Sequence, residues 1–171
     1  MKIERSWAMP SKDTFSIKPV GELVKRLVSD PENTASIDPF SNGKDYATIT
    51  NDLDQDLPAT FHEDALDFLK GCMTDNISLV LFDPPYSPRQ VSECYKKLGK
   101  TVNMQTTQAS YWSNMKKEIG RIVRPGGQVL TCGWNSGGVG KKYGFEIEEI
   151  LLVAHGGWHN DTICTVERKV K

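Results

Sequence analysis

The feature that most constrains this chain is the apolar run Ile77-Ser78-Leu79-Val80-Leu81-Phe82, which is followed at once by Asp83-Pro84-Pro85-Tyr86. A nearly continuous apolar run of this length is typical of a parallel strand that is covered on both faces. Consecutive prolines cannot extend such a strand, so it is expected to end at Asp83. Because ligands bind beyond the carboxyl ends of strands in open α/β sheets, Asp83 marks a candidate site.

The periodicity of the remaining chain alternates between strands and helices. Strands are predicted at 34–37, 46–50, 59–61, 77–82 and 128–132, and helices at 19–28, 65–70, 87–99 and 112–123. Residues 100–107 are expected to form a loop, and 147–154 and 162–167 a terminal hairpin. The order predicts a three-layer α/β fold with a mostly parallel sheet and a C-terminal antiparallel hairpin. The gaps 39–45 and 53–58 are too short for ordinary crossovers, so the helices between the early strands are shortened or missing.

Length and charge limit the function classes. The 171 residues fit a single domain spanning 1–171, and no apolar run is long enough to cross a membrane, so a cytoplasmic protein is expected. The net charge of −1 gives no overall attraction for nucleic acid. Basic residues nevertheless dominate 86–125, whereas acidic residues dominate 30–67. The basic half either binds a phosphate backbone or forms solvated helix faces.

Nothing in the sequence favours a bound metal. The four cysteines are scattered singly, without the paired spacing of a zinc site. His155 and His159 are separated by Gly156-Gly157, which breaks the helix that would aim both imidazoles together. No metal is expected.

Acidic side chains stand where four of the predicted strands end. They are Asp38, Asp52, Asp64 and Asp83. One such aspartate is an ordinary turn former, but four at one edge of a sheet indicate a ligand site.

The segment Asp83-Pro84-Pro85-Tyr86 after an apolar strand resembles the catalytic motif of S-adenosylmethionine-dependent amino-methyltransferases, and Asp-Pro-Pro-Tyr is most typical of their DNA adenine-N6 branch. Other segments agree with this family in order: Phe15-Ser16-Ile17-Lys18-Pro19, Asp38-Pro39-Phe40, Asp64-Ala65-Leu66 and Arg124-Pro125-Gly126-Gly127. The likeness covers almost the whole chain and is strongest to small phage- and prophage-type members. It implies a Rossmann-like methyltransferase fold. It also implies cofactor contacts from Ile17, Lys18, Pro19, Asp38, Pro39, Phe40, Asp52, Asp64 and Ala65.

The motif suits methylation of an exocyclic amino group. The lone pair of such a nitrogen is delocalised into the ring, which makes the nitrogen a poor nucleophile. The Asp83 side chain and the Pro84 carbonyl can accept both amino hydrogens and so favour a pyramidal nitrogen. Pro85 would stiffen the loop, and the Tyr86 ring would stack on a flipped base.

Two late loops supply candidate substrate contacts. Trp158, His159 and Asn160 lie between the hairpin strands, and Trp158 either clamps the base or folds onto the core. Trp134, Asn135, Lys141 and Lys142 follow the strand 128–132, and this segment either binds phosphates or is a plain connector.

Two departures from the family bear on different parts of the function: the first predicts weak affinity for S-adenosylmethionine, and the second leaves the substrate open. The first cofactor loop holds one glycine, Gly43, where family members usually have two, and no segment resembles a target-recognition domain. Specificity is therefore expected to be low, or to come from a second copy or another subunit. DNA adenine-N6 methylation is the leading hypothesis. The alternatives are an RNA adenine-N6 or guanine-N2 enzyme, a cytosine-N4 enzyme, and a non-catalytic nucleic-acid-binding subunit.

Overall fold

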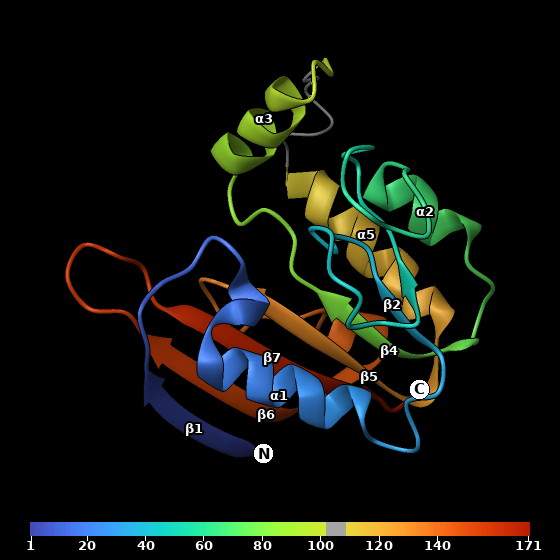
Figure 1. Ribbon diagram of the computed structural model, residues 1–171. Helices are drawn as coiled ribbons and strands as arrows, with labels where there is room; N and C mark the ends of the chain where they lie inside the picture. Colours follow the sequence, from blue (N-terminus) through green and yellow to red (C-terminus); the bar gives the residue numbers. More distant parts are fainter. Residues whose placement is uncertain (102–108) are drawn as a thin grey trace.

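The centre of the molecule is a seven-stranded sheet with the strand order β1-β6-β7-β5-β4-β2-β3 (Figure 1). The computed structural model describes residues 1–101 and 109–171. The strands are β1 (Lys2–Trp7), β2 (Ser36–Asp38), β3 (Ile49–Thr50), β4 (Ile77–Phe82), β5 (Val123–Gly133), β6 (Phe145–Ala154) and β7 (Thr162–Lys169). Only β7 runs antiparallel to its neighbours. This confirms the mostly parallel sheet and the C-terminal hairpin.

Helices cover both faces of the sheet (Figure 1). They are α1 (Lys18–Val28), α2 (Ala65–Gly71), α3 (Pro88–Lys97) and α5 (Ala109–Ile122), with short 3-10 turns at Thr14–Ser16 and Lys141–Tyr143. Pro19 lies in the first turn of α1, where its missing N–H costs no helix hydrogen bond. Of the helices described here, none is both long and apolar enough to cross a membrane.

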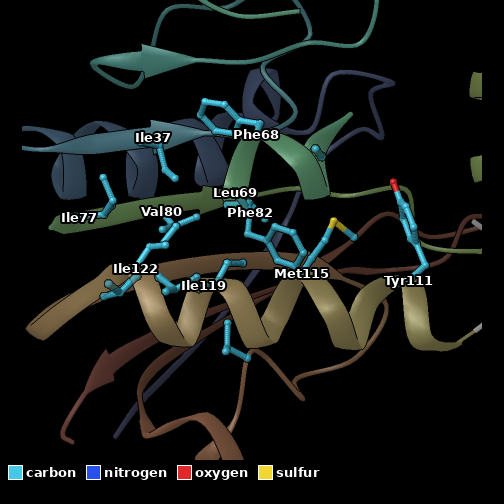
Figure 2. Packing of buried hydrophobic residues seen from close by; sticks show 14 of the residues in the cluster. Ile37, Phe68, Leu69, Ile77, Val80, Phe82, Tyr111, Met115, Ile119 and Ile122 are labelled. Carbon is cyan, nitrogen blue, oxygen red and sulfur yellow. The ribbon is translucent and has the colours of Figure 1, made fainter. Parts of the chain in front are cut away.

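Strand β4 is buried on both faces, as its composition predicts. Leu79 and Leu81 pack into the core under α1, whereas Val80 and Phe82 pack into the core under α2 and α5. Figure 2 shows the second core, in which side chains of α5 such as Met115 lie against those of β4. Full burial of a large apolar side chain contributes about 1.5–3 kcal/mol, so this strand anchors the fold.

The early strands differ from the prediction. No strand forms at 59–61; only an isolated bridge links Asn51 to Phe61, and β3 is reduced to Ile49–Thr50. Backbone bonds form only around Phe61, whose N–H donates to the Thr50 carbonyl at 3.0 Å. Beside it side-chain hydroxyls take over, because the Thr50 N–H donates to Thr60 Oγ1 at 3.2 Å and the Thr60 N–H donates to Thr50 Oγ1 at 3.0 Å. The crossovers after β2 and β3 contain no helix, as expected from their length.

Two features at strand starts were not anticipated. β1 pairs in parallel with β6, although its charged sequence gives little sign of a strand. Val123, expected to close a helix, instead begins β5, where it pairs with Ile77. The predicted loop at 100–107 lies mostly outside the described residues.

Candidate functional site

A cavity of about 930 Å³ opens where the parallel strands end. Its lining includes the segments that follow β2, β3, β4 and β5, together with the loop between β6 and β7. The lining residues that the sequence also singled out are Pro39, Phe40, Asp52, Asp64, Ala65, Asp83, Pro84, Pro85, Tyr86, Trp134, Trp158, His159 and Asn160. The strand ends therefore bring most of the candidate residues together.

Asp83 is held by the hydroxyl group of Tyr86. The Tyr86 hydroxyl donates to Asp83 Oδ1 at 2.5 Å and lies 3.2 Å from the hydroxyl of Thr14. Burial raises the pKa of Asp83 to about 6, although the hydrogen bonds from Tyr86 and Thr14 act in the opposite direction. Asp83 is therefore largely ionised at neutral pH and has a preferred orientation.

The loop after β4 is pinned from two helices. The indole N–H of Trp112 in α5 donates to the Pro85 carbonyl at 2.9 Å. The backbone N–H of Tyr86 donates to Gln90 Oε1 at 2.6 Å, and Ser87 caps α3. These contacts preorganise the loop that carries Asp83.

Asp38 at the end of β2 is completely buried. Its Oδ1 accepts the Phe40 N–H at 3.0 Å, but within the described structure its Oδ2 is buried without a hydrogen-bond partner. Burial raises the pKa of Asp38 to about 8, and the nearby carboxylates of Asp83 and Asp52 push it in the same direction. Asp38 is therefore mostly protonated at neutral pH unless a positive charge binds beside it.

Asp52 and Asp64 both line the cavity, and each organises nearby backbone. Asp52 accepts the N–H groups of Asn42 at 2.8 Å and Asp54 at 2.9 Å. Asp64 caps α2 by accepting the Leu66 N–H at 3.0 Å, and it also accepts a hydrogen bond from the Tyr95 hydroxyl. A carboxylate offers about four acceptor positions, so both aspartates keep capacity for a ligand.

Aromatic side chains stand over the mouth of the cavity. Trp158 is fully exposed, which makes the alternative that it folds onto the core wrong. Trp134 is 44% exposed, and its ring meets the edge of Tyr86 with 5.7 Å between centroids. Tyr86 therefore contacts Trp134 through its ring and Asp83 through its hydroxyl.

Several predicted contacts do not reach the cavity. Ile17 is buried beneath α1, and Lys18 and Pro19 form the first turn of that helix; the preceding residues 10–15 line the cavity instead. Lys141 and Lys142 directly precede β6, so they lie at the opposite edge of the sheet, in a separate hollow of about 530 Å³. Asn135 is likewise absent from the lining of the cavity, and so is Asp38, which is completely buried directly before the lining residues Pro39 and Phe40.

Sequence reasoning missed His155, which follows β6 and lines the cavity. Its Nδ1 lies 2.8 Å from the Ala8 carbonyl, and its Nε2 lies 2.8 Å from Thr162 Oγ1. It therefore ties the N-terminal segment to the start of β7. Its position directly after a predicted strand was the available signal. Thr14 and Trp112 gave no such signal, because their contacts are tertiary.

The sequence matches no protein-family model and no curated protein. Solved structures, methyltransferases among them, have the same fold as this chain. TrmN from Thermus thermophilus is 15% identical with a TM-score of 0.58, over 90% of this chain and 49% of that one. A 1,6-didemethyltoxoflavin-N1-methyltransferase from Burkholderia thailandensis, solved with S-adenosylhomocysteine, is 9% identical with a TM-score of 0.60, over 90% and 78%.

A third structure, NSun6 from Pyrococcus horikoshii with SFG, is 15% identical with a TM-score of 0.54, over 87% of this chain and 51% of that one. This chain has a Rossmann-like methyltransferase fold. It spans about half the length of TrmN and of NSun6. Within the methyltransferase fold, the cavity lies at the edge of the sheet where ligands bind in open α/β proteins.

Replacing Tyr86 with phenylalanine tests the hold on Asp83. The Tyr86 hydroxyl favours the ionised carboxylate, so its loss is expected to raise the Asp83 pKa above the value of about 6. A pH titration of the Asp83 carboxyl carbon by NMR measures this directly and requires no activity. Tyr143→Phe, which removes a hydroxyl at the far edge of the sheet, serves as the control. An Asp83 pKa that is equal in wild type and Tyr86→Phe would show that the hydrogen bond does not govern its ionisation.

Proposed function

We propose that this protein methylates the N6 amino group of adenine in DNA and takes the methyl group from S-adenosylmethionine. One observation carries the proposal: an ionised, fixed Asp83 followed by Pro84 lies in a cavity beneath Trp134 and the exposed Trp158. A carboxylate and a carbonyl side by side suit an amino group with two hydrogens, and the indoles suit a planar base.

The residues of the cavity fit the cofactor. A volume of about 930 Å³ accommodates a ligand of its size together with a base. Asp52 and Asp64 line the cavity and keep acceptor capacity for hydroxyl and amino groups. Asp38 does not line the cavity itself but directly precedes the lining residues Pro39 and Phe40, and among the described residues its Oδ2 has no hydrogen-bond partner. S-adenosylmethionine, when bound, supplies a methyl group on a positively charged sulfur.

The chain's own residues act on the amino group. Asp83 accepts a hydrogen bond from one N–H of the amino group, and the Pro84 carbonyl accepts a hydrogen bond from the other. Together they favour a pyramidal nitrogen whose lone pair is no longer conjugated with the ring. Asp83 can do this only when ionised, so methyl transfer is expected to decline as the pH falls below about 6. Tyr86 keeps the carboxylate oriented until the amino group arrives.

A base reaches the cavity only after leaving the helical stack, which is the route used by enzymes that modify bases in a duplex. Trp158 is placed to receive it, since its side chain is exposed and lines the cavity. Lys12 and Lys97 also line the cavity and are available to single phosphate groups, but acidic lining residues such as Asp13, Asp54 and Glu93 outnumber them, so the cavity as a whole does not attract a phosphate backbone.

Asp83→Asn is expected to lower kcat about 10²- to 10³-fold, because asparagine presents one acceptor oxygen and no charge to the amino group. Tritiated methyl transfer to DNA and to RNA, followed by mass spectrometry of the nucleosides, measures both rate and product. Asp56→Asn, at an exposed aspartate outside the lining of the cavity, is the matched control. Retention of full activity by Asp83→Asn contradicts the mechanism, whereas a product other than N6-methyladenine in DNA changes the substrate and leaves the mechanism standing.

Trp158→Ala is expected to weaken substrate binding by about 1–3 kcal/mol, the value of stacking one base on an aromatic ring. Cofactor affinity and the free energy of unfolding should stay unchanged, because Trp158 is fully exposed. KM for DNA and the Kd of the cofactor by calorimetry separate the two effects. Val170→Ala removes another exposed apolar side chain and serves as the control. An equal loss of both affinities would place Trp158 at the cofactor instead.

Asp38 is expected to couple cofactor charge to pH. Asp38 has a pKa of about 8, and only its ionised form attracts a cation, so Asp38 must lose its proton before it can stabilise a positive charge nearby. The affinity for the positively charged cofactor is therefore expected to increase as the pH rises. The ratio of Kd for S-adenosylhomocysteine to Kd for S-adenosylmethionine should increase from about pH 6 to about pH 8, because only the latter carries the sulfonium charge. Asp38→Asn should make the ratio independent of pH, and a pH-dependent ratio in that variant would exclude Asp38 as the source.

A further inference from the structure

Large apolar side chains alternate along β1 and point away from the core. Met1, Ile3, Trp7 and Met9 are each at least 60% exposed. The even-numbered residues face the other way: Lys2 pairs with Glu149, and Ala8 packs on the core under α1. One face of this edge strand is therefore apolar and open to solvent.

The neighbouring strand β6 extends this apolar face. Ile3 pairs with Ile150 and Arg5 with Leu152, so these side chains lie on one side of the sheet. Ile150 and Leu152 are only half-buried and belong to neither hydrophobic core. The connection from β5 to β6, residues 134–144, contains no α-helix, whereas a parallel crossover usually supplies one to cover the sheet.

The outer edge of β1 has free hydrogen-bonding groups. The Ala8 N–H donates to the Ala154 carbonyl of β6, so the even-numbered residues of β1 direct their backbone groups inward. Because these directions alternate along a strand, Ile3, Arg5 and Trp7 direct theirs outward. In the described part of the chain, β1 has β6 as its one neighbour in the sheet. An additional strand can therefore pair with this edge.

We propose that a second copy of this chain occupies this edge, with the two β1 strands antiparallel about a two-fold axis at Arg5. The apolar residues of β1 are arranged symmetrically about Arg5. This register places Ile3 opposite Trp7 and Met1 opposite Met9, so apolar side chains meet apolar side chains across the axis. The outward-facing backbone N–H and C=O groups of Ile3 in one copy then form hydrogen bonds with those of Trp7 in the other. Each register places two like charges together on the axis, either Arg5 with Arg5 or Glu4 with Glu4, so the apolar pairs decide between them. A two-fold at Glu4 would oppose Ile3 with Arg5 and lose the apolar pairing.

The proposed interface borders the cavity. The Ala8 carbonyl is hydrogen-bonded to His155. The Trp7 indole lies against Gly156, because a Cβ atom built at Gly156 would be 3.5 Å from the indole nitrogen. Residues 10–15, which follow directly, line the cavity. Pairing of β1 would therefore support the wall formed by residues 10–15 and the loop that carries Trp158. The proposal stands whether or not the protein is a methyltransferase.

Sedimentation velocity through the micromolar range tests the dimer. Wild type should sediment as a dimer, and the double variant Ile3→Lys with Trp7→Lys as a monomer with an unchanged circular dichroism spectrum. The double variant Met73→Lys with Val170→Lys adds the same charge at exposed apolar positions elsewhere and should remain dimeric. A monomeric wild type, or a dimer that survives the β1 changes, overturns the proposal. DNA binding by a monomeric wild type that is lost in the β1 variant would also overturn it, with nucleic acid as the occupant.

The register is tested by the residue on the axis. Arg5→Ala removes a like-charge contact and should tighten the dimer about two- to five-fold, whereas Glu4→Ala should not. Arg5→Cys, made together with Cys94→Ser to remove the exposed native thiol, should cross-link on addition of oxidised glutathione, which is reduced as the disulfide forms. Cross-linking of Glu4→Cys but not Arg5→Cys would overturn the Arg5 register.

Discussion

The burial of β4 on both faces is the constraint on which the rest of the structure depends. Its alternating side chains join two separate cores, so the strand has no face that it can turn to solvent. With the strand fixed, its end is fixed too, and Asp83 emerges at a defined point of the cavity. The bond from Trp112 to Pro85 extends this rigidity past the strand into the loop. Core packing and site geometry are thus one continuous arrangement.

The parts of the fold that were predictable are those with strong hydrophobic periodicity. β4, α1 and the terminal hairpin follow from their apolar patterns. β1 was missed because Arg5 interrupts its apolar alternation and charged residues stand between the apolar ones, a pattern that an edge strand exposed to solvent tolerates. The segment 59–61 was overpredicted because local β propensity does not reveal that backbone pairing stops at the bridge to Phe61 and that threonine hydroxyls bind the neighbouring N–H groups.

The candidate site, too, could be predicted from the sequence only in part. Aspartates at strand ends could be located from the sequence, because parallel strands bring their carboxyl ends to one edge. The hydrogen-bond partners of these aspartates were harder to predict. Tyr86 lies close to Asp83 in the sequence, but Tyr95, which donates to Asp64, belongs to a distant helix. Lys141 was misplaced because it precedes β6, and a parallel strand begins at the edge opposite to the one where it ends.

Two completely buried acidic residues, Glu167 and Asp38, differ in how far their oxygens are hydrogen-bonded. Glu167 is completely buried, but its two oxygens accept the N–H groups of Val139 and Gly140, at 2.5 Å and 2.8 Å. Its burial is compensated, and it holds a turn. Asp38 is equally buried and leaves Oδ2 without a partner among the described residues, a cost of the kind that protein interiors rarely carry. Burial and the nearby Asp83 carboxylate raise the pKa of Asp38 to about 8, so protonation relieves part of this cost at neutral pH. A perturbed carboxyl group directly before the lining residues Pro39 and Phe40 is of the kind that clusters at functional sites.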